Sequence, residues 1–242
     1  MKHNDYIELA ERAETKSFMD GTSVMIPHKY ANKKDIEISG IIASWLIFDD
    51  ENKSIAMAER ILGKVMDNKP YEYIVSDKWC QYKDDYTCLF SFITWHNFAM
   101  LCNKLKCIYY NHGDLEAALV STVNDKKHKH TNYYNGLCEL LSGETMIQTG
   151  DSSSSCFRAN LFLRWMARKN SPVDLGIWKD VSENKLFVSC DANAIQQSKY
   201  LGITSKLECN FKNMEAITKF SREIFYKDPS RMDYVFYALR NR

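Results

Sequence analysis

Apolar residues recur at the helical period through most of this chain. In the stretch "DIEISGIIASWLIF", the residues Ile38, Ile41, Ile42 and Trp45 fall on one face of a helix, and residues 216–225 repeat the pattern. Alternation of apolar and polar residues at period two, which marks a half-buried strand, is hard to find over any length. The sequence therefore predicts an all-α fold.

The prolines divide the chain into helices. Pro27, Pro70, Pro172 and Pro229 all fall at expected helix starts or connections. In "KDPSRMDYVF", Asp228 has the residue type of an N-cap, and Pro229 follows in the first helical turn, where its missing amide proton costs nothing. We expect about ten helices.

The longest polar connection, "NDKKHKHTN" at 124–132, is the expected connection between two lobes. No linker rich in glycine, serine or proline marks a clean boundary there. With 242 residues, the chain has the length of one large domain or of two small lobes that share a core. We therefore predict a single globular domain of two interleaved helical lobes.

The overall charge argues against a strongly basic protein. The net charge is +1 and the isoelectric point is about 7.5, so any nucleic-acid surface must be a local patch. The N-terminus is charged and amphipathic, and no run reaches the roughly 18 apolar residues of a membrane-spanning helix. We expect a cytoplasmic protein, a monomer with no membrane partner.

Cysteine and histidine usage does not favour a metal site. The eight cysteines are scattered, none stands in a CxxC pair, and several lie in apolar runs, as is typical of free thiols in a reducing cell. Hydrolysis at a metal held by His28, or by His128 and His130, has little support, because no third ligand stands at a readable spacing. We expect neither a metal nor a cofactor.

The helix predicted in "CFRANLFLRWMARK" has an apolar face built of Leu161, Phe162, Trp165 and Met166. On its other side, Arg164 and Arg168 stand four residues apart and form a basic stripe. Phe157 falls on this polar side at the N-terminal end. Two interpretations stay open: the Phe157 ring packs into a neighbouring lobe, or it lies at the mouth of a cleft and stacks on a base.

Asp191 precedes a second helix of interest, in "SCDANAIQQSKYLGI". Apolar positions at Ala194, Ile195 and Leu201 define this helix, and Gly202 is the expected C-terminal cap. The predicted role of Asp191 is an N-cap, which contributes about 1 kcal/mol. A carboxylate at a helix start can also face a cleft, where it orients water or stabilises a developing oxocarbenium ion. The two roles are compatible.

Three features follow one another along the chain: a hairpin-like turn, the helix "FRANLFLRW" and the segment "DANAI…LGI". In this order they resemble the helix–hairpin–helix DNA glycosylase superfamily, especially its oxidised-guanine glycosylase branch. In that branch the helix after the hairpin begins with a catalytic lysine and continues into a run similar to Phe162, Leu163 and Arg164. A later aspartate, with a histidine or similar residue two positions on, resembles Asp191 and Asn193. The resemblance implies a helix–hairpin–helix glycosylase fold.

More of the chain is similar to a bacterial domain-of-unknown-function family that is associated with this superfamily. The similar segments span nearly the full length: "IPHKY", "KKDIEISGIIA", "MDNKPYEYI", "HGDLEAAL", "LFLRWMARKNSPVDLGIW" and "DPSRMDYVFYALR".

The chain departs from the glycosylase pattern at its centre. The lysine position falls on Phe157, and residues 151–163 contain no lysine. A bifunctional glycosylase attacks the sugar with an amine to form a Schiff base, and a phenyl ring cannot do so. The hairpin with paired glycines is replaced by "TGDSSSSCF", which keeps only Gly150, although its backbone amides can still hold a phosphate. The segment between Phe157 and Asp191 is also longer than in compact relatives.

The resemblance implies a DNA-binding, glycosylase-like relative in base-excision repair, whose partner is double-stranded DNA. It is either monofunctional, with Asp191 helping water to displace a flipped base, or inactive; bifunctional lyase activity is not expected. The implied phosphate contacts are Arg158, Arg164, Arg168, Lys169 and Gly150. The implied stacking rings are Phe157, Trp165 and Trp178. The alternative for the basic cluster is a solvated helix face. The alternative function is a non-enzymatic helical binding protein with only the ancestry of a glycosylase.

Overall fold

The structure, a computed structural model, describes residues 1–125, 132–147 and 153–240. The chain forms two compact units that alternate along the sequence. Unit 1 comprises Met1–Met19, Asn132–Asn135 and Thr149–Arg242, and unit 2 comprises Asp20–Thr131 and Gly136–Gln148. The expected connection around 124–132 falls mostly outside the described residues.

Helices make up most of the described chain, as the sequence predicts. Within these residues there are eleven α-helices and one two-stranded sheet. The helices of unit 1 are α1 (His3–Ala13), α8 (Phe157–Ala167), α9 (Ala192–Tyr200), α10 (Phe211–Ile224) and α11 (Met232–Arg240). Those of unit 2 are α2 (Lys33–Trp45), α3 (Glu51–Arg60), α4 (Pro70–Val75), α5 (Trp95–His112) and α6 (Leu115–Asn124). Helix α7 (Tyr133–Leu141) begins in unit 1 and continues in unit 2.

Short helical segments connect these elements. They are the 3-10 turns η1 (Lys16–Met19), η2 (Ser23–Met25), η3 (Pro27–Lys29), η5 (Lys78–Tyr82), η6 (Glu183–Lys185) and η7 (Pro229–Arg231), and the π-helical turn η4 (Ile61–Val65). Three prolines begin helical elements, as expected: Pro27 begins η3, Pro70 begins α4 and Pro229 begins η7. Asp228 takes the N-cap position of η7, but its side chain makes no capping hydrogen bond there.

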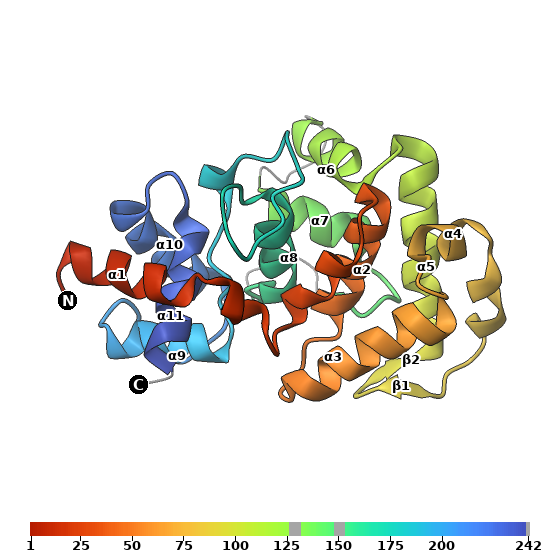
Figure 1. The fold of residues 1–242 in the computed structure, drawn as a ribbon, viewed down its shortest axis with the longest axis horizontal. Helices are drawn as coiled ribbons and strands as arrows, with labels where there is room; N and C mark the ends of the chain where they lie inside the picture. The colour runs from red at the N-terminus through yellow and green to blue at the C-terminus, as the bar shows by residue number, and fades with distance from the viewer. Residues whose placement is uncertain (126–131, 148–152, 241–242) are drawn as a thin grey trace. The chain divides into compact units, whose positions relative to one another are not determined.

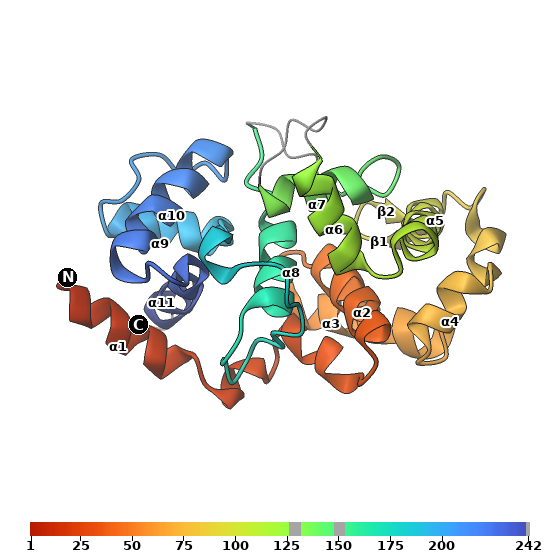
Figure 2. The ribbon, with the colours of Figure 1, turned by 90° about the horizontal axis from the view of Figure 1, so that it is seen from above.

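In unit 1 the first and last helices pack together. Helix α1 lies alongside α11, and α11 also contacts α9 (Figures 1 and 2). Phe162 and Trp165 of α8 and Phe236 of α11 are fully or almost fully buried. The burial of these large side chains is the main favourable term for folding this unit.

In unit 2 the helix α2 packs on α3 and α4, and α5 packs on α6 (Figure 1). Every residue of α2 from Ile36 to Trp45 is buried, so the predicted apolar face is part of a helix that protein surrounds on all sides. Ser39 and Ser44 fit this setting because each hydroxyl donates to a carbonyl of its own helix, at 3.1 Å. The Trp45 indole donates to the carbonyl of Thr145, at 2.9 Å.

One small sheet departs from the all-α prediction. Strands β1 (Cys88–Phe90) and β2 (Ile93–Thr94) pair antiparallel, and the turn between them contains Ser91 in the left-handed region, with φ of 55°. Strands this short have no room for the alternation that would reveal them in the sequence.

Candidate functional site

Helix α8 begins at Phe157, as the sequence predicts. Cys156, at its N-cap position, has left-handed backbone angles (φ 45°, ψ 43°), which is uncommon for a residue with a side chain. The buried Asn160 amide holds this turn by donating to the carbonyl of Ser155, at 3.0 Å. Phe157 is half-buried, and the Arg158 guanidinium lies 4.8 Å from the centre of its ring.

Helix α9 begins directly after Asp191, and the predicted N-cap is confirmed. The carboxylate of Asp191 accepts a hydrogen bond from the amide of Ala194, at 2.7 Å. Gly202 follows the helix with φ of 74°, as expected of a C-terminal cap. Asn193 donates to the backbone carbonyl of Phe236 at 3.3 Å, which ties α9 to α11.

One serine connects the two helix starts. The Ser155 hydroxyl donates to the carbonyl of Cys190 at 2.7 Å, and the Ser155 amide donates to the carbonyl of Cys209 at 3.2 Å. Ser155 stands two residues before Phe157, and Cys190 immediately precedes Asp191. The fold therefore brings together two short segments that are far apart in the sequence. We refer to Ser155, Phe157, Cys190 and Asp191 as the Asp191 site.

The carboxyl group of Asp191 is accessible but partly desolvated. Asp191 is an exposed residue, yet the protein atoms around its carboxyl group displace water and raise its pKa. The capping hydrogen bond from Ala194 and the positive charge of Arg240 act in the opposite direction but do not outweigh this desolvation. As an exposed residue, Asp191 is accessible to a ligand.

Arg164 and Arg168 lie elsewhere than the sequence predicts. Their side chains are only 3% and 4% exposed, so the expected basic stripe on a solvated face is wrong. Arg164 pairs with Asp174 at 3.2 Å and with Asp233 at 2.8 Å. Helical phase placed both arginines opposite the apolar face, but it carries no information on carboxylates that arrive from distant segments.

Arg168 is the centre of this ion network. It pairs with Glu14 at 2.6 Å, with Asp174 at 2.8 Å and with Asp228 at 2.6 Å. Burial alone would lower the pKa of the Arg168 guanidinium, but hydrogen bonding to Glu14 and the nearby aspartates raises it instead. Arg168 therefore stays charged and joins α8 to the segments that carry its partners.

Further groups complete the ion network. Arg231 pairs with Glu14 at 2.9 Å, and the Tyr234 hydroxyl donates to Asp174 at 2.8 Å. The Tyr234 ring also lies against both buried guanidinium groups, 4.7 Å from Arg164 and 5.1 Å from Arg168. In this structure the two arginines are engaged inside unit 1 and are not available to a phosphate.

The remaining predicted contacts lie in three environments. Trp165 and Trp178 are buried, and the Trp178 ring packs edge-on against Phe162 at 5.4 Å, so neither indole can stack on a base in this structure. Arg158 is half-buried and Lys169 is exposed. Gly150 lies outside the described residues.

One known protein family matches almost the whole chain. Residues 23–241 match the family described as "Protein of unknown function (DUF2400)". The chain belongs to the DUF2400 family. This confirms the expected domain-of-unknown-function family, and the match covers both helix starts of the Asp191 site. No curated protein and no solved structure matches the chain, and the glycosylase resemblance stays a prediction.

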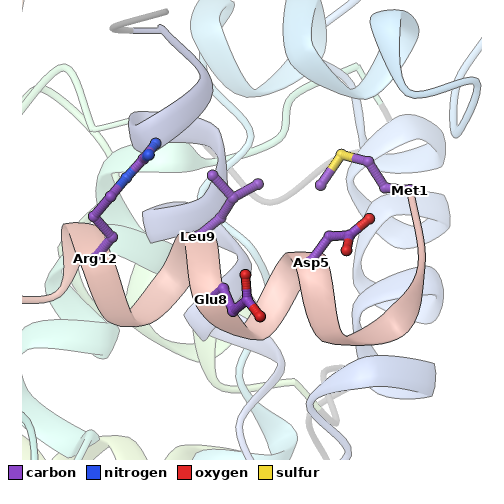
Figure 3. A pocket seen from close by; sticks show the side chains of 5 residues that line it. All are labelled: Met1, Asp5, Glu8, Leu9 and Arg12. Carbon is purple, nitrogen blue, oxygen red and sulfur yellow. The ribbon is translucent and has the colours of Figure 1, made fainter.

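Two cavities of this DUF2400 protein lie away from the Asp191 site. One, of about 320 Å³, runs along α1 beside Asp5, Glu8 and Arg12 (Figure 3). A second, of about 410 Å³, lies beside the ion network. Both are lined by charges of both signs, a pattern that favours no particular ligand charge.

The described parts of the chain, residues 1–125, 132–147 and 153–240, contain no cluster of three or more side chains suited to hold a metal ion. Nor is any helix within those ranges long and apolar enough to cross a membrane. His128 and His130 lie outside these ranges.

Two groups near Asp191 were not found from the sequence. Ser155 was one of a run of serines, and nothing in the run distinguishes the hydroxyl that bonds to Cys190. Arg240 is an exposed residue at the end of α11 whose charge acts on Asp191. The similarity of "DPSRMDYVFYALR" to the family pattern included this arginine, but only the fold places it near α9.

Proposed function

We propose that this protein is a DNA-binding relative of the helix–hairpin–helix DNA glycosylases, without lyase chemistry, in which Asp191 acts on a flipped nucleotide. The observation that carries the proposal is the hydrogen bond from Ser155 to Cys190, at 2.7 Å. This bond sets the start of α8, where Phe157 stands, beside the start of α9, which Asp191 caps. The proposal needs this arrangement, because the Phe157 ring and the Asp191 carboxylate must both reach the same flipped nucleotide.

The chemistry follows from what the Asp191 site contains. Phe157 has no amine, so the site cannot form a Schiff base through that side chain. The Asp191 carboxylate can orient a water molecule and stabilise the positive charge that develops on the sugar as the base departs. A water nucleophile leaves an abasic site and an unbroken strand, which defines a monofunctional glycosylase. Phe157 supplies a half-buried aromatic ring, as a flipped base requires for stacking.

The phosphate contacts must come from accessible cations. We propose Lys169, Arg240 and the accessible part of Arg158, and we assign Arg164 and Arg168 to the ion network. Each phosphate contact adds about 0.9 to the slope of log affinity against log salt. With a net charge of +1, little other attraction would mask the loss of one contact.

The test combines binding with base release. Labelled duplexes that carry oxidised guanine, uracil or an alkylated base are titrated with the protein at several salt concentrations. Strand scission is then read before and after alkali. The proposal expects salt-dependent binding, a slope flattened by about one unit in Lys169→Ala, and scission only after alkali. Absence of binding to every duplex at low salt would reject it.

A second candidate is a non-enzymatic helical binding protein. The observation that favours it is the burial of Arg164, Arg168, Trp165 and Trp178, which removes half of the predicted DNA-contacting groups from the surface. The same assay separates the two candidates. A folded protein that binds none of the duplexes even at low salt would support this second function.

A further inference from the structure

Two cysteines meet beside the Asp191 site. Cys190 is fully buried and stands immediately before Asp191, whereas Cys209 is exposed in the segment that leads to α10. Their backbones are held side by side, because both carbonyl groups accept hydrogen bonds from Ser155. The pair is thus fixed at two backbone points, independently of its thiol groups.

Each thiol group shifts the pKa of the other. Hydrogen bonding to Cys209, and next burial, raise the pKa of the Cys190 thiol. Hydrogen bonding to Cys190 lowers the pKa of the Cys209 thiol, against the effect of its own partial burial. Cys209 is exposed and Cys190 is fully buried, so Cys209 is the sulfur that an oxidant can reach first. This division of roles suits an attacking thiol and a resolving thiol.

We propose that Cys190 and Cys209 form a reversible intramolecular disulfide, with a small-molecule disulfide as the oxidant. This site of modification is independent of the DNA chemistry proposed above.

The reaction balances in two exchange steps. The Cys209 thiolate attacks the oxidant, so a Cys209 mixed disulfide forms and one small thiolate leaves and takes up a proton. The Cys190 sulfur then attacks the Cys209 sulfur, its proton passes to the second departing thiolate, and the protein disulfide is complete. Two protein thiols are oxidised, and the oxidant is reduced to two small thiols.

The test uses the full chain with oxidised glutathione as the probe. After alkylation of free thiols and cleavage at lysine and arginine, Cys190 and Cys209 lie on different peptides, 186–199 and 207–212. The expected product is these two peptides joined by a disulfide, with two thiols lost from the eight and regained after dithiothreitol. Recovery of the two peptides unlinked from fully equilibrated protein would overturn the proposal.

Matched variants separate the pair from general thiol reactivity. Cys209→Ser should abolish the linked product, whereas Cys107→Ser, which removes another exposed thiol, should leave its yield unchanged. In Cys190→Ala the mixed disulfide with glutathione should persist at Cys209, because no thiol resolves it. If Cys190→Ala does not fold, the wild-type peptide map decides by itself. A link from Cys209 to another cysteine, such as Cys156, would also contradict the proposed pair.

Discussion

The hydroxyl group of Ser155 donates a hydrogen bond of 2.7 Å to the backbone carbonyl of Cys190. Both residues are buried, so neither group has water as an alternative partner. This one contact sets the start of α8 beside the start of α9, and the placement of Asp191 relative to Phe157 depends on it.

Removal of the Ser155 hydroxyl should therefore be costly. We predict that Ser155→Ala lowers the free energy of unfolding by about 1–3 kcal/mol, because a buried carbonyl loses its partner. Ser205→Ala, at an exposed position, should change it by no more than about 0.5 kcal/mol. Urea unfolding measures both, and equal stability of the two variants would show that the contact contributes nothing.

The ion network should be essential for the stability of unit 1. Arg168→Met leaves Asp228 without its cation and removes one of the two guanidinium groups from Glu14 and from Asp174, which keep Arg231 and Arg164, and we predict a loss of about 3–5 kcal/mol. Lys199→Met, which removes an exposed cation, serves as the matched control and should have little effect. Thermal unfolding followed by circular dichroism tests this, and an Arg168→Met midpoint like that of the control would count against a structural role.

The pKa of Glu14 predicts that the stability of unit 1 depends on pH. Burial by itself would raise its pKa, but hydrogen bonds from Arg168, Ser171 and Arg231 hold the pKa below the ordinary value of 4.5. A depressed pKa in the folded state gives stability that is present above the unfolded value and is lost as the pH falls through the folded value. The stability advantage of wild type over Glu14→Gln should hold near neutral pH and shrink below pH 4.5. A constant advantage down to strongly acidic pH would contradict this assignment.

The sequence predicted the helical fold, several helix starts and the cap at Asp191 because these depend on local patterns. The period of apolar residues, the proline at Pro229 and the cap at Asp191 all act within a turn or two of the chain. The ion network could not be predicted in this way. Its partners Glu14, Asp174 and Asp233 come from three separate segments, and only the tertiary fold shows that Arg164 and Arg168 point toward them.

The same limit explains what the sequence showed of the Asp191 site. It identified Phe157 and Asp191 through resemblance and helix starts, but the contact between their segments runs through Ser155. A hydroxyl that bonds to a distant backbone carbonyl leaves no spacing or composition signal, and any of the four serines at 152–155 would have fitted the pattern equally well.

The missing amine gives a prediction for covalent trapping. Wild-type protein should form no covalent complex with an abasic duplex in the presence of borohydride, because Phe157 cannot form a Schiff base. Phe157→Lys places an amine at the start of α8 and should restore trapping, whereas Phe211→Lys, a half-buried position at the start of α10, should not. Electrophoresis of labelled DNA shows the complex. Efficient trapping by wild type would mean that another lysine acts.

The central claim is that Asp191 acts in base release, and the most direct test of it is to measure base release by Asp191→Asn. Asparagine caps a helix as well as aspartate does, so this substitution keeps the contact with Ala194 and removes only the charge. Asp50→Asn makes the same change at the exposed N-cap of α3 and is the matched control. We predict that wild type and Asp50→Asn release a base from at least one damaged duplex, seen as scission after alkali, and that Asp191→Asn loses this release at least a hundredfold while remaining folded. Base release by Asp191→Asn at the wild-type rate would contradict the claim.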